Sequence, residues 1–222
     1  MVSLSKRLMA RLALPILAKS KTYQSVYLNG TEIRKGRRNI LTRWQAIEGI
    51  LENQDVRSVL DIGCAEGFFV RKAAEKGCFA TGVDADGRRL LWGSATLCMD
   101  DVDQVAFVKM MLTRDNLSLL SPADMVINLS LTHHIMYKHG EPYALEFVRA
   151  ARALTRKVMI FEMGQSNEVF FAWSKLLPDM GSDPHAWIEG FLMRCGFARV
   201  EKICTVEAHK GGGIRATFAA YI

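Results

Sequence analysis

Apolar segments of strand length alternate with segments of helical periodicity from about residue 40 to the end of the chain. The apolar segments predict strands over residues 58–62, 80–83, 105–110, 124–130 and 157–162. The periodic segments predict helices over residues 43–51, 68–76, 87–95, 143–154, 168–177 and 185–195. This alternation predicts an α/β fold, with a mostly parallel sheet covered by helices on both faces.

The C-terminal part departs from the simple alternation. Cys195-Gly196-Phe197 ends a helix, residues 199–208 predict a strand, and Gly211-Gly212-Gly213 turns the chain into a last strand over residues 214–221. A hairpin at this point closes the sheet with an antiparallel strand. The pattern predicts one domain over residues 41–222, preceded by an N-terminal basic helix and extension over residues 1–40.

Positive charge is concentrated in the first fifth of the chain, which has a formal net charge of +6 overall. The basic residues there are Lys6, Arg7, Arg11, Lys19, Lys21, Arg34, Lys35, Arg37, Arg38 and Arg43. This asymmetry favours an anionic partner such as phosphate, nucleic acid or a lipid surface, although a solvated basic face explains it equally well. Residues 1–20 predict a basic amphipathic helix that packs on the domain or lies peripherally on a membrane, because their apolar run is too short to span one.

Five cysteines, at positions 64, 78, 98, 195 and 204, form no C-x-x-C pair and lie at no metal-ligand spacing from a histidine. This usage is typical of a reduced, cytoplasmic protein. We expect no bound metal, since nothing in the spacing of the histidines and carboxylates requires one.

A glycine-containing turn follows the first predicted strand, in Val59-Leu60-Asp61-Ile62-Gly63-Cys64-Ala65-Glu66-Gly67. The glycines allow a sharp turn and a close approach of the backbone to a ligand. A dinucleotide-binding turn has the spacing G-x-G-x-x-G and receives a pyrophosphate. Here the spacing is G-x-x-x-G, and Asp61 and Glu66 would repel a pyrophosphate. The charges therefore favour S-adenosylmethionine, which carries an ammonium and a sulfonium group and no phosphate.

Asp84 ends the second predicted strand, where its carboxylate can accept both hydroxyls of a ribose. The alternative is that Asp61 and Asp84 only cap helices or loops. Together with the glycine turn, Asp84 resembles the first two motifs of the class I S-adenosylmethionine-dependent methyltransferases. The resemblance implies a Rossmann-like sheet of seven strands with an antiparallel last strand, S-adenosylmethionine as cofactor, and methyl transfer as the activity.

Carried onto this sequence, the resemblance and the strand ends predict a set of cofactor-binding residues. These are Asp61, Gly63, Cys64, Ala65, Glu66, Gly67, Phe68, Asp84, Ala85, Met111, Leu112, Asn128 and Ser130. Met111 and Leu112 are also typical of core packing. Substrate-binding candidates are Tyr23, Arg37, Arg43 and Trp173. For Arg37 there are two alternatives: it pairs with the carboxylate of the methyl donor, or it is exposed on the surface.

The fourth predicted strand ends in a polar cluster, Asn128-Leu129-Ser130-Leu131-Thr132-His133-His134. Open α/β sheets bind ligands at the carboxyl ends of their strands, so this cluster is expected beside the methyl group of the donor. His133 and His134 are candidate catalytic bases, and on an extended chain at most one of them faces the methyl donor. Glu162 ends the next strand and can orient a histidine or receive a substrate hydroxyl.

The segment 129–140 resembles the corresponding stretch of the methyltransferases that cap bacterial O-antigen chains, and more distantly that of RNA 5′-phosphate methyltransferases. Both resemblances imply methylation of an oxygen atom in a small-molecule or glycan-like acceptor, either a sugar hydroxyl or a phosphate. A phosphate needs mainly positive charge for positioning, whereas a hydroxyl benefits from a base. Two alternatives are methylation of an RNA end or base, and a non-catalytic scaffold at a membrane or protein surface.

Overall fold

The computed structural model describes residues 21–36, 40–208 and 213–222, together with positions 8, 12 and 15. It divides into two compact units. Unit 1 comprises Met1–Ile40 and Arg57–Met111, and unit 2 comprises Leu41–Val56 and Leu112–Ile222. Each unit carries one group of the candidate residues predicted from the sequence.

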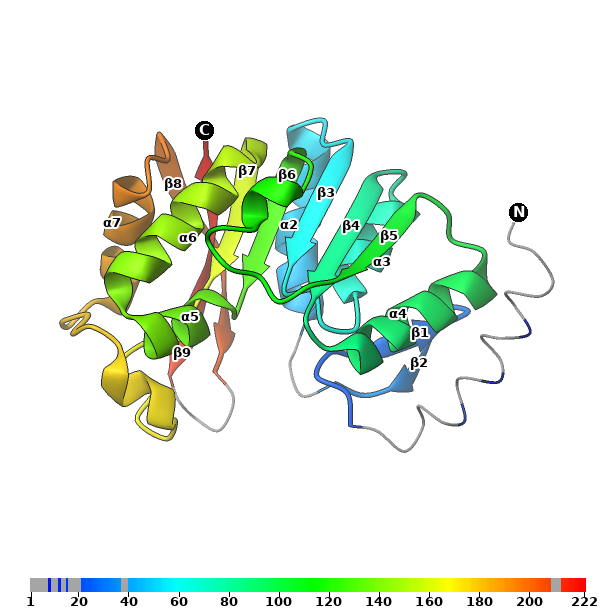
Figure 1. Cartoon of the computed structure of the whole chain (residues 1–222), viewed down its shortest axis with the longest axis horizontal. Coiled ribbons are helices and arrows are strands. Elements are labelled where there is room, and N and C mark those ends of the chain that lie inside the picture. The colour runs from blue at the N-terminus through cyan, green and yellow to red at the C-terminus, as the bar shows by residue number, and fades with distance from the viewer. Residues whose placement is uncertain (1–7, 9–11, 13–14, 16–20, 37–39, 209–212) are drawn as a thin grey trace. The chain divides into compact units, whose positions relative to one another are not determined.

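The strands form a seven-stranded sheet in the order β5-β4-β3-β6-β7-β9-β8 (Figure 1). In unit 1, β3 is parallel to β4 and β4 is parallel to β5. In unit 2, β6 is parallel to β7, and β9 runs antiparallel to both β7 and β8. The predicted Rossmann-like α/β fold with an antiparallel last strand is confirmed.

Unit 1 is built on three parallel strands whose connections are helices. Its elements are β3 (Ser58–Ile62), α3 (Phe68–Glu75), β4 (Phe79–Asp84), α4 (Gly87–Asp100) and β5 (Val105–Lys109). The β3 side chains from Val59 to Ile62 are buried, as expected for a strand covered on both faces. Asp86 caps α4 by accepting a hydrogen bond from the backbone N–H of Arg88.

A small β-hairpin precedes this sheet, and it was not predicted from the sequence. Strands β1 (Val26–Leu28) and β2 (Thr31–Arg34) pair antiparallel across a turn in which Asn29 and Gly30 have φ angles of 47° and 72°. Two successive positive φ angles are typical of a type I′ turn, and an Asn-Gly pair is its strongest sequence signal. In Figure 1 the hairpin lies beside α4, where Asn29 N–H donates to the Asp100 carboxylate at 2.9 Å.

The segment before the hairpin is attached to the loop after β3 by hydrogen bonds in both directions. The Glu66 carboxylate accepts the backbone N–H groups of Tyr23 and Gln24, each at 2.8 Å. The Gln24 side chain in turn accepts the N–H of Phe68 at the start of α3, at 3.0 Å. Because all four N–H groups of the first helical turn need partners, Gln24 acts as a cap supplied from a distant part of the chain.

Unit 2 combines the remaining strands with most of the helices. Its elements are α2 (Leu41–Asn53), β6 (Ala123–Leu129), α5 (Thr132–His139), α6 (Glu141–Ala153), β7 (Thr155–Glu162), α7 (Pro184–Arg194), β8 (Arg199–Glu207) and β9 (Ile214–Tyr221), with 3-10 helices η1 (Leu117–Leu119) and η2 (Ala172–Leu176). Strands β6, β7 and β9 form its core, in which Ile127, Phe161 and Phe218 are buried. A strand rich in apolar residues is favourable here because both faces of the sheet are covered.

Two predictions for unit 2 were wrong. Residues after Leu131 form helix α5 and do not continue a strand, so His133 and His134 are successive helical residues whose rings lie side by side. The helix predicted over residues 168–177 is replaced by turns and the short η2. The reason is tertiary: the Glu168 carboxylate accepts the N–H of Gln165 and the guanidinium of Arg215, which holds residues 165–168 in a turn.

The helix predicted for residues 1–20 lies outside the described residues, except for positions 8, 12 and 15, of which Leu8 and Leu12 are exposed. Among the described residues, no helix combines the length and the apolar character needed to cross a membrane. All five cysteines are free. The domain boundary expected at residue 40 and the membrane contact of residues 1–20 stay predictions.

Replacing Glu66 with Gln is expected to loosen the segment around Tyr23 and Gln24. The amide keeps one acceptor oxygen and presents an NH2 group to the other backbone N–H, so at least one charge-assisted hydrogen bond, of about 1.5–3 kcal/mol, is lost. Hydrogen exchange should then accelerate in residues 22–36 and stay unchanged in β3 to β5. Glu75→Gln, which removes an exposed carboxylate of the same unit, is the control. Equal protection of residues 22–36 in both variants would contradict this role of Glu66.

Candidate functional site

The loop after β3 has an unusual backbone. Residues Gly63, Ala65 and Gly67 have φ angles of 82°, 50° and 76°. The loop is closed by hydrogen bonds from the N–H groups of Gly63 and Cys64 to the Val83 carbonyl, at 2.7 and 3.1 Å. A Cβ atom on Gly67 would lie 2.6 Å from the Phe107 ring, so a side chain is excluded there for steric as well as conformational reasons. The result is a tight turn in which the backbone itself can approach a ligand.

Asp61 is a buried carboxylate beneath this loop. It is 2% exposed, and its Oδ2 atom has no hydrogen-bond partner within the described part of the chain. Burial, and secondarily the nearby charge of Asp84, raise the pKa of Asp61 well above its usual value. An unpaired buried carboxylate is costly, and a ligand with positive charge would offset that cost. The residues present therefore fit a cationic ligand.

Asp84, at the end of β4, is held in a fixed orientation. Its Oδ2 accepts the N–H of Ala65 at 2.9 Å, and its Oδ1 accepts the N–H of Asp86 at 2.8 Å. The first of these bonds explains how Ala65 is kept at a positive φ. Each carboxylate oxygen has further lone pairs, so the half-buried Asp84 can still accept hydroxyl groups from a ligand.

Glu66 was predicted to bind the cofactor, and the structure brings it together with Tyr23 and Gln24 through the hydrogen bonds described above. Burial raises the pKa of Glu66, while the bonds from Tyr23 and Gln24 oppose that increase. The Tyr23 ring also lies 5.4 Å from the guanidinium of Arg89 on α4. The structure thus places Tyr23 at the loop after β3, and Glu66 is the residue that holds it there.

The other residues predicted for the cofactor site in unit 1 differ in exposure. Phe68 begins α3 and is buried, as is Cys64, whose thiol has a raised pKa because of that burial. Ala85 and Met111 are exposed. Leu112 is half-buried in unit 2. Arg37 and Arg38 lie outside the described residues.

In unit 2, Glu162 is buried at the end of β7 and is surrounded by cationic and hydroxyl groups. Its Oε2 lies 2.6 Å from Arg43 Nε, and its Oε1 accepts the Ser130 hydroxyl at 2.9 Å. The Thr217 hydroxyl donates to Oε2 at 3.4 Å, and Arg215 Nη1 lies 3.5 Å from Oε1. Glu162 was predicted to orient a histidine or a substrate hydroxyl, and the structure brings it together with two arginines.

Arg215 and Glu168 complete this buried network, and sequence reasoning missed both. Arg215 donates from Nε and Nη2 to the two oxygens of Glu168, each at 2.7 Å. The side chains of Arg43, Arg215, Glu162 and Glu168 together carry no net charge. A sequence signal for Arg215 did exist, because it is the one charged residue in an apolar strand that ends the chain. Glu168 gave no such signal within a segment predicted to be helical.

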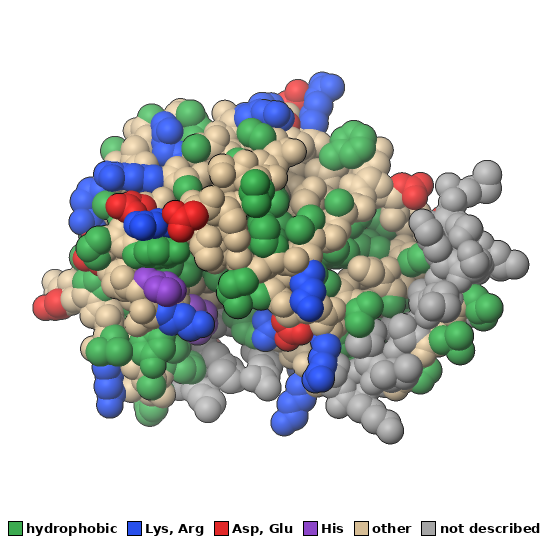
Figure 2. Space-filling model, viewed as in Figure 1, with side chains coloured by type: hydrophobic (Ala, Val, Ile, Leu, Met, Phe, Trp, Pro, Cys, Tyr) green, Lys and Arg blue, Asp and Glu red, His purple; other side chains and the backbone are tan. Residues whose placement is uncertain are grey.

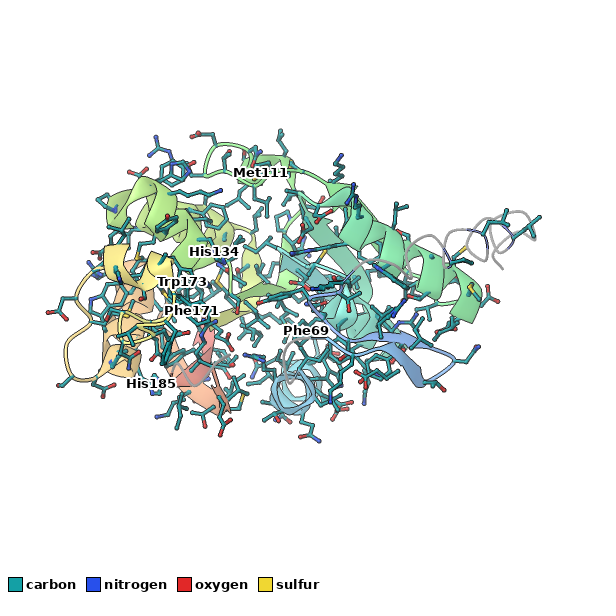
Figure 3. The ribbon with its side chains drawn as sticks, turned by 90° about the horizontal axis from the view of Figure 1, so that it is seen from below. Phe69, Met111, His134, Phe171, Trp173 and His185 are labelled. Carbon is teal, nitrogen blue, oxygen red and sulfur yellow. The ribbon has the colours of Figure 1, made fainter. Side chains whose placement is uncertain are left out.

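His133, His134 and Trp173 form an aromatic cluster beside this network. The His133 ring lies 4.1 Å from that of His134 and 4.5 Å from that of Trp173. Figure 3 shows His134 and Trp173 side by side, with Phe171 next to Trp173 on the same segment. His133 is buried and His134 is exposed. The structure therefore brings two predicted catalytic residues together with one predicted substrate-binding residue.

The protonation of His133 is defined by a backbone hydrogen bond. The N–H of Gly164 donates to His133 Nδ1 at 3.0 Å. Since Nδ1 acts as the acceptor, the neutral ring carries its proton on Nε2. A neutral His133 with this bond therefore carries an N–H group at Nε2, and its predicted role as a catalytic base stays a prediction.

Asn128 and Ser130, both predicted for the cofactor site, are held by other side chains of unit 2. The buried Asn128 exchanges hydrogen bonds with Thr132 at the start of α5, at 3.1 and 3.3 Å. Ser130, with a φ of 59°, donates to Glu162 and accepts from Arg215 Nη1 at 3.3 Å. These bonds fix the chain where β6 passes into α5.

Figure 2 shows Lys and Arg side chains spread over the drawn face among uncharged and acidic ones. Histidine side chains reach this surface over α5, which carries the exposed His134 and His139. Recognition of a nucleic acid backbone usually relies on a basic patch or stripe.

The fold is that of the class I methyltransferases. It has their sheet order, the antiparallel β9, and a glycine-containing loop in the sequence between the carboxylates of Asp61 and Asp84. No family model matches the chain. The chain is 30% identical over 145 residues to the O-antigen chain terminator bifunctional methyltransferase/kinase WbdD of Escherichia coli, a match that covers 64% of this chain and 19% of that protein. The chain thus spans about a fifth of the length of the curated relatives it matches.

The solved structures that share this fold include those of two proteins, WbdD and EvdMO1. A structure of the bifunctional kinase-methyltransferase WbdD has a TM-score of 0.78 and 22% identity, covering 93% of this chain and 45% of that one. The N-terminal domain of EvdMO1, crystallised in the presence of SAH and D-fucose, has a TM-score of 0.66 and 12% identity, covering 97% of this chain and 96% of that one. The predicted resemblance to methyltransferases that terminate O-antigen chains is confirmed.

Replacing Asp61 with Asn should change how stability depends on pH. Because the pKa of Asp61 is raised in the folded chain, its contribution to stability is full below the unfolded pKa of about 3.9 and is lost as the pH rises through the folded pKa. The variant lacks this loss, so its stability relative to wild type should be greater at pH 7 than at pH 4. Urea unfolding across this range measures the effect. Parallel pH profiles for wild type and variant would contradict it, and the exposed Asp103→Asn is the control.

The Arg43–Glu162 pair should show strong energetic coupling. Glu162→Gln alone removes the negative charge that lies 2.6 Å from Nε of the buried Arg43, and is expected to cost about 3–5 kcal/mol of unfolding free energy. The double variant Arg43→Met/Glu162→Gln should cost less than the sum of the single variants. Denaturant unfolding of the four proteins gives the coupling energy directly. Simple additivity would show that the two charges do not stabilise one another.

Proposed function

We propose that the chain is an S-adenosylmethionine-dependent methyltransferase that methylates an oxygen atom of a glycan-like acceptor, either a sugar hydroxyl or a phosphate. The observation that carries the proposal is the buried Oδ2 of Asp61, which has no hydrogen-bond partner among the described residues and lies beside the positive-φ loop from Gly63 to Gly67. The similarity to a chain-terminating methyltransferase supports the activity and the acceptor class. The presence of SAH and D-fucose in the EvdMO1 structure supports the cofactor and a sugar-like acceptor.

The proposed roles in the cofactor site follow from charge and hydrogen-bonding capacity. Asp61 provides negative charge to the cationic part of S-adenosylmethionine, and Asp84 accepts the ribose hydroxyls. The backbone from Gly63 to Gly67 provides close contact without side chains, and Tyr23 closes the site from the N-terminal segment. When bound, the cofactor supplies an electrophilic methyl group on its sulfonium.

The proposed roles at the acceptor follow from the two histidines. His133 donates the N–H of Nε2 to an acceptor oxygen, because its Nδ1 is engaged by Gly164. His134, exposed at the start of α5, is the residue that takes the proton when the acceptor is a hydroxyl. A phosphate oxygen needs no base, and the Nε2 N–H of His133 then donates a hydrogen bond to the anion. Trp173 supplies an aromatic surface beside both rings.

Catalysis in such a displacement depends largely on positioning the acceptor oxygen in line with the methyl group. Removing His134 is therefore expected to slow methylation of a hydroxyl by up to about 10²–10⁴-fold without abolishing it, and to affect a phosphate acceptor less. Comparing both acceptor types in one assay distinguishes the two forms of the proposal. The predicted roles of Arg37 and Arg43 in substrate binding remain part of the proposal.

The test has two stages. Calorimetry should show that wild type binds S-adenosylmethionine, and that Asp61→Ala and Asp84→Ala each weaken binding by about 10-fold or more, as expected for loss of a charge-assisted contact. The exposed Asp103→Ala should bind like wild type. Incubation with S-adenosylmethionine and a glycan extract should then produce species heavier by one CH2 group. Unchanged affinity in both aspartate variants, or no methylated product, would overturn the proposal.

A further inference from the structure

Arg215 makes a geometrically rigid ion pair with Glu168. The guanidinium is 1% exposed and binds both carboxylate oxygens in parallel, at 2.7 Å each. Bidentate pairs of this kind fix orientation as well as distance, and lysine cannot reproduce them. Arg215 therefore determines where the Glu168 carboxylate lies.

Glu168 in turn determines the shape of the chain that precedes it. Its Oε1 accepts the N–H of Gln165 at 2.9 Å, and its own N–H donates to the Gln165 carbonyl at 3.1 Å. The Gln165 side chain also donates to the Ile214 carbonyl at 3.1 Å, next to Arg215. The turn over residues 165–168 is thus tied to the start of β9 at two points.

Gly164 enters this turn, and its peptide group has little freedom to rotate. A Cβ atom on Gly164 would lie 2.2 Å from the Trp173 ring, so Trp173 packs directly on this backbone. The Gly164 N–H points at His133 Nδ1. Trp173 itself lies 5.6 Å from the Arg215 guanidinium. The same ion pair is therefore linked to two groups that contact His133, namely the Gly164 N–H and the Trp173 ring.

We propose that Arg215 and Glu168 are positioning residues that hold His133 in the form with its proton on Nε2, by fixing the Gly164 N–H against Nδ1. If this N–H were displaced, Nδ1 would be able to carry the proton and Nε2 would lose its N–H. The importance of this form for catalysis rests on the proposed function, but the state of the ring does not. Hydrogen bonds to the second ring nitrogen commonly set the protonated position of a histidine.

A structural role for the pair would predict a different result. A buried ion pair that only stabilises the fold would, when weakened, lower stability without changing the protonated position of His133 in the molecules that remain folded. The decisive measurement is therefore the nitrogen spectrum of histidine, which distinguishes the two neutral forms in folded protein.

The experiment uses full-length protein with ¹⁵N-labelled histidine, in which His133→Gln identifies the resonances of that ring. Wild type is expected to carry the proton on Nε2. In Glu168→Gln, Glu168→Asp and Arg215→Lys, the resonances should shift toward a mixture of forms. Glu141→Gln, which removes the partner of the exposed Arg194, should leave them unchanged. Proton on Nδ1 in wild type, or unchanged His133 resonances in every folded variant, would overturn the proposal.

Kinetics connect this result with the proposed function. The same variants should lower kcat/KM for the acceptor by up to about 10²-fold, the effect expected when a reacting group is misplaced by about 1 Å, and leave the affinity for S-adenosylmethionine unchanged. Glu141→Gln should behave like wild type. If wild type transfers no methyl group, the proposed function fails, while the spectra still decide the positioning role. Shifted spectra without a change in kcat/KM would overturn the catalytic importance of the Nε2 proton.

Discussion

The burial of carboxylates at the ends of strands and in the segments that follow them is the constraint on which the arrangement of this protein depends. In unit 2, Glu162 and Glu168 are compensated by Arg43 and Arg215, so that each buried charge has a partner. Such a network contributes little net stability compared with an apolar core, but it strongly penalises any arrangement that leaves one member unpaired. The network therefore holds three segments in one arrangement: the end of β6, the turn over residues 165–168 and the start of β9.

Among the described residues of unit 1, the buried carboxylates are not paired with arginines as those of unit 2 are. Glu66 is satisfied by two backbone N–H groups, and this attaches the segment of Tyr23 to the loop after β3. Asp61 keeps an oxygen without a partner among the described residues. A buried charge that has a partner within the protein stabilises the structure. A buried charge that has none favours the binding of a ligand of opposite charge. This contrast separates the residues that build the site from those that we propose to bind the cofactor.

Much of the fold could be predicted from the sequence because it depends on local patterns. The strands from Ser58 to Glu162 are apolar runs of strand length, and the helices between them have clear periodicity. The hairpin over residues 26–34 was missed although Asn29-Gly30 signals its turn. The prediction of a helix over residues 168–177 was wrong, because Arg215, which is distant in the sequence, stabilises a turn there.

The sequence by itself determined the class of the fold and the character of the proposed cofactor site. Both follow from short-range information: Asp61, the glycines and Asp84 lie next to strands that their own apolar residues define. Only the tertiary structure decided which groups Glu66, Glu162 and His133 contact. Their partners lie far away along the chain: Glu66 binds residues 23 and 24, Glu162 binds Arg43, and His133 binds Gly164. A side chain's hydrogen-bond partners depend on which segments folding brings together, and no local pattern contains that information.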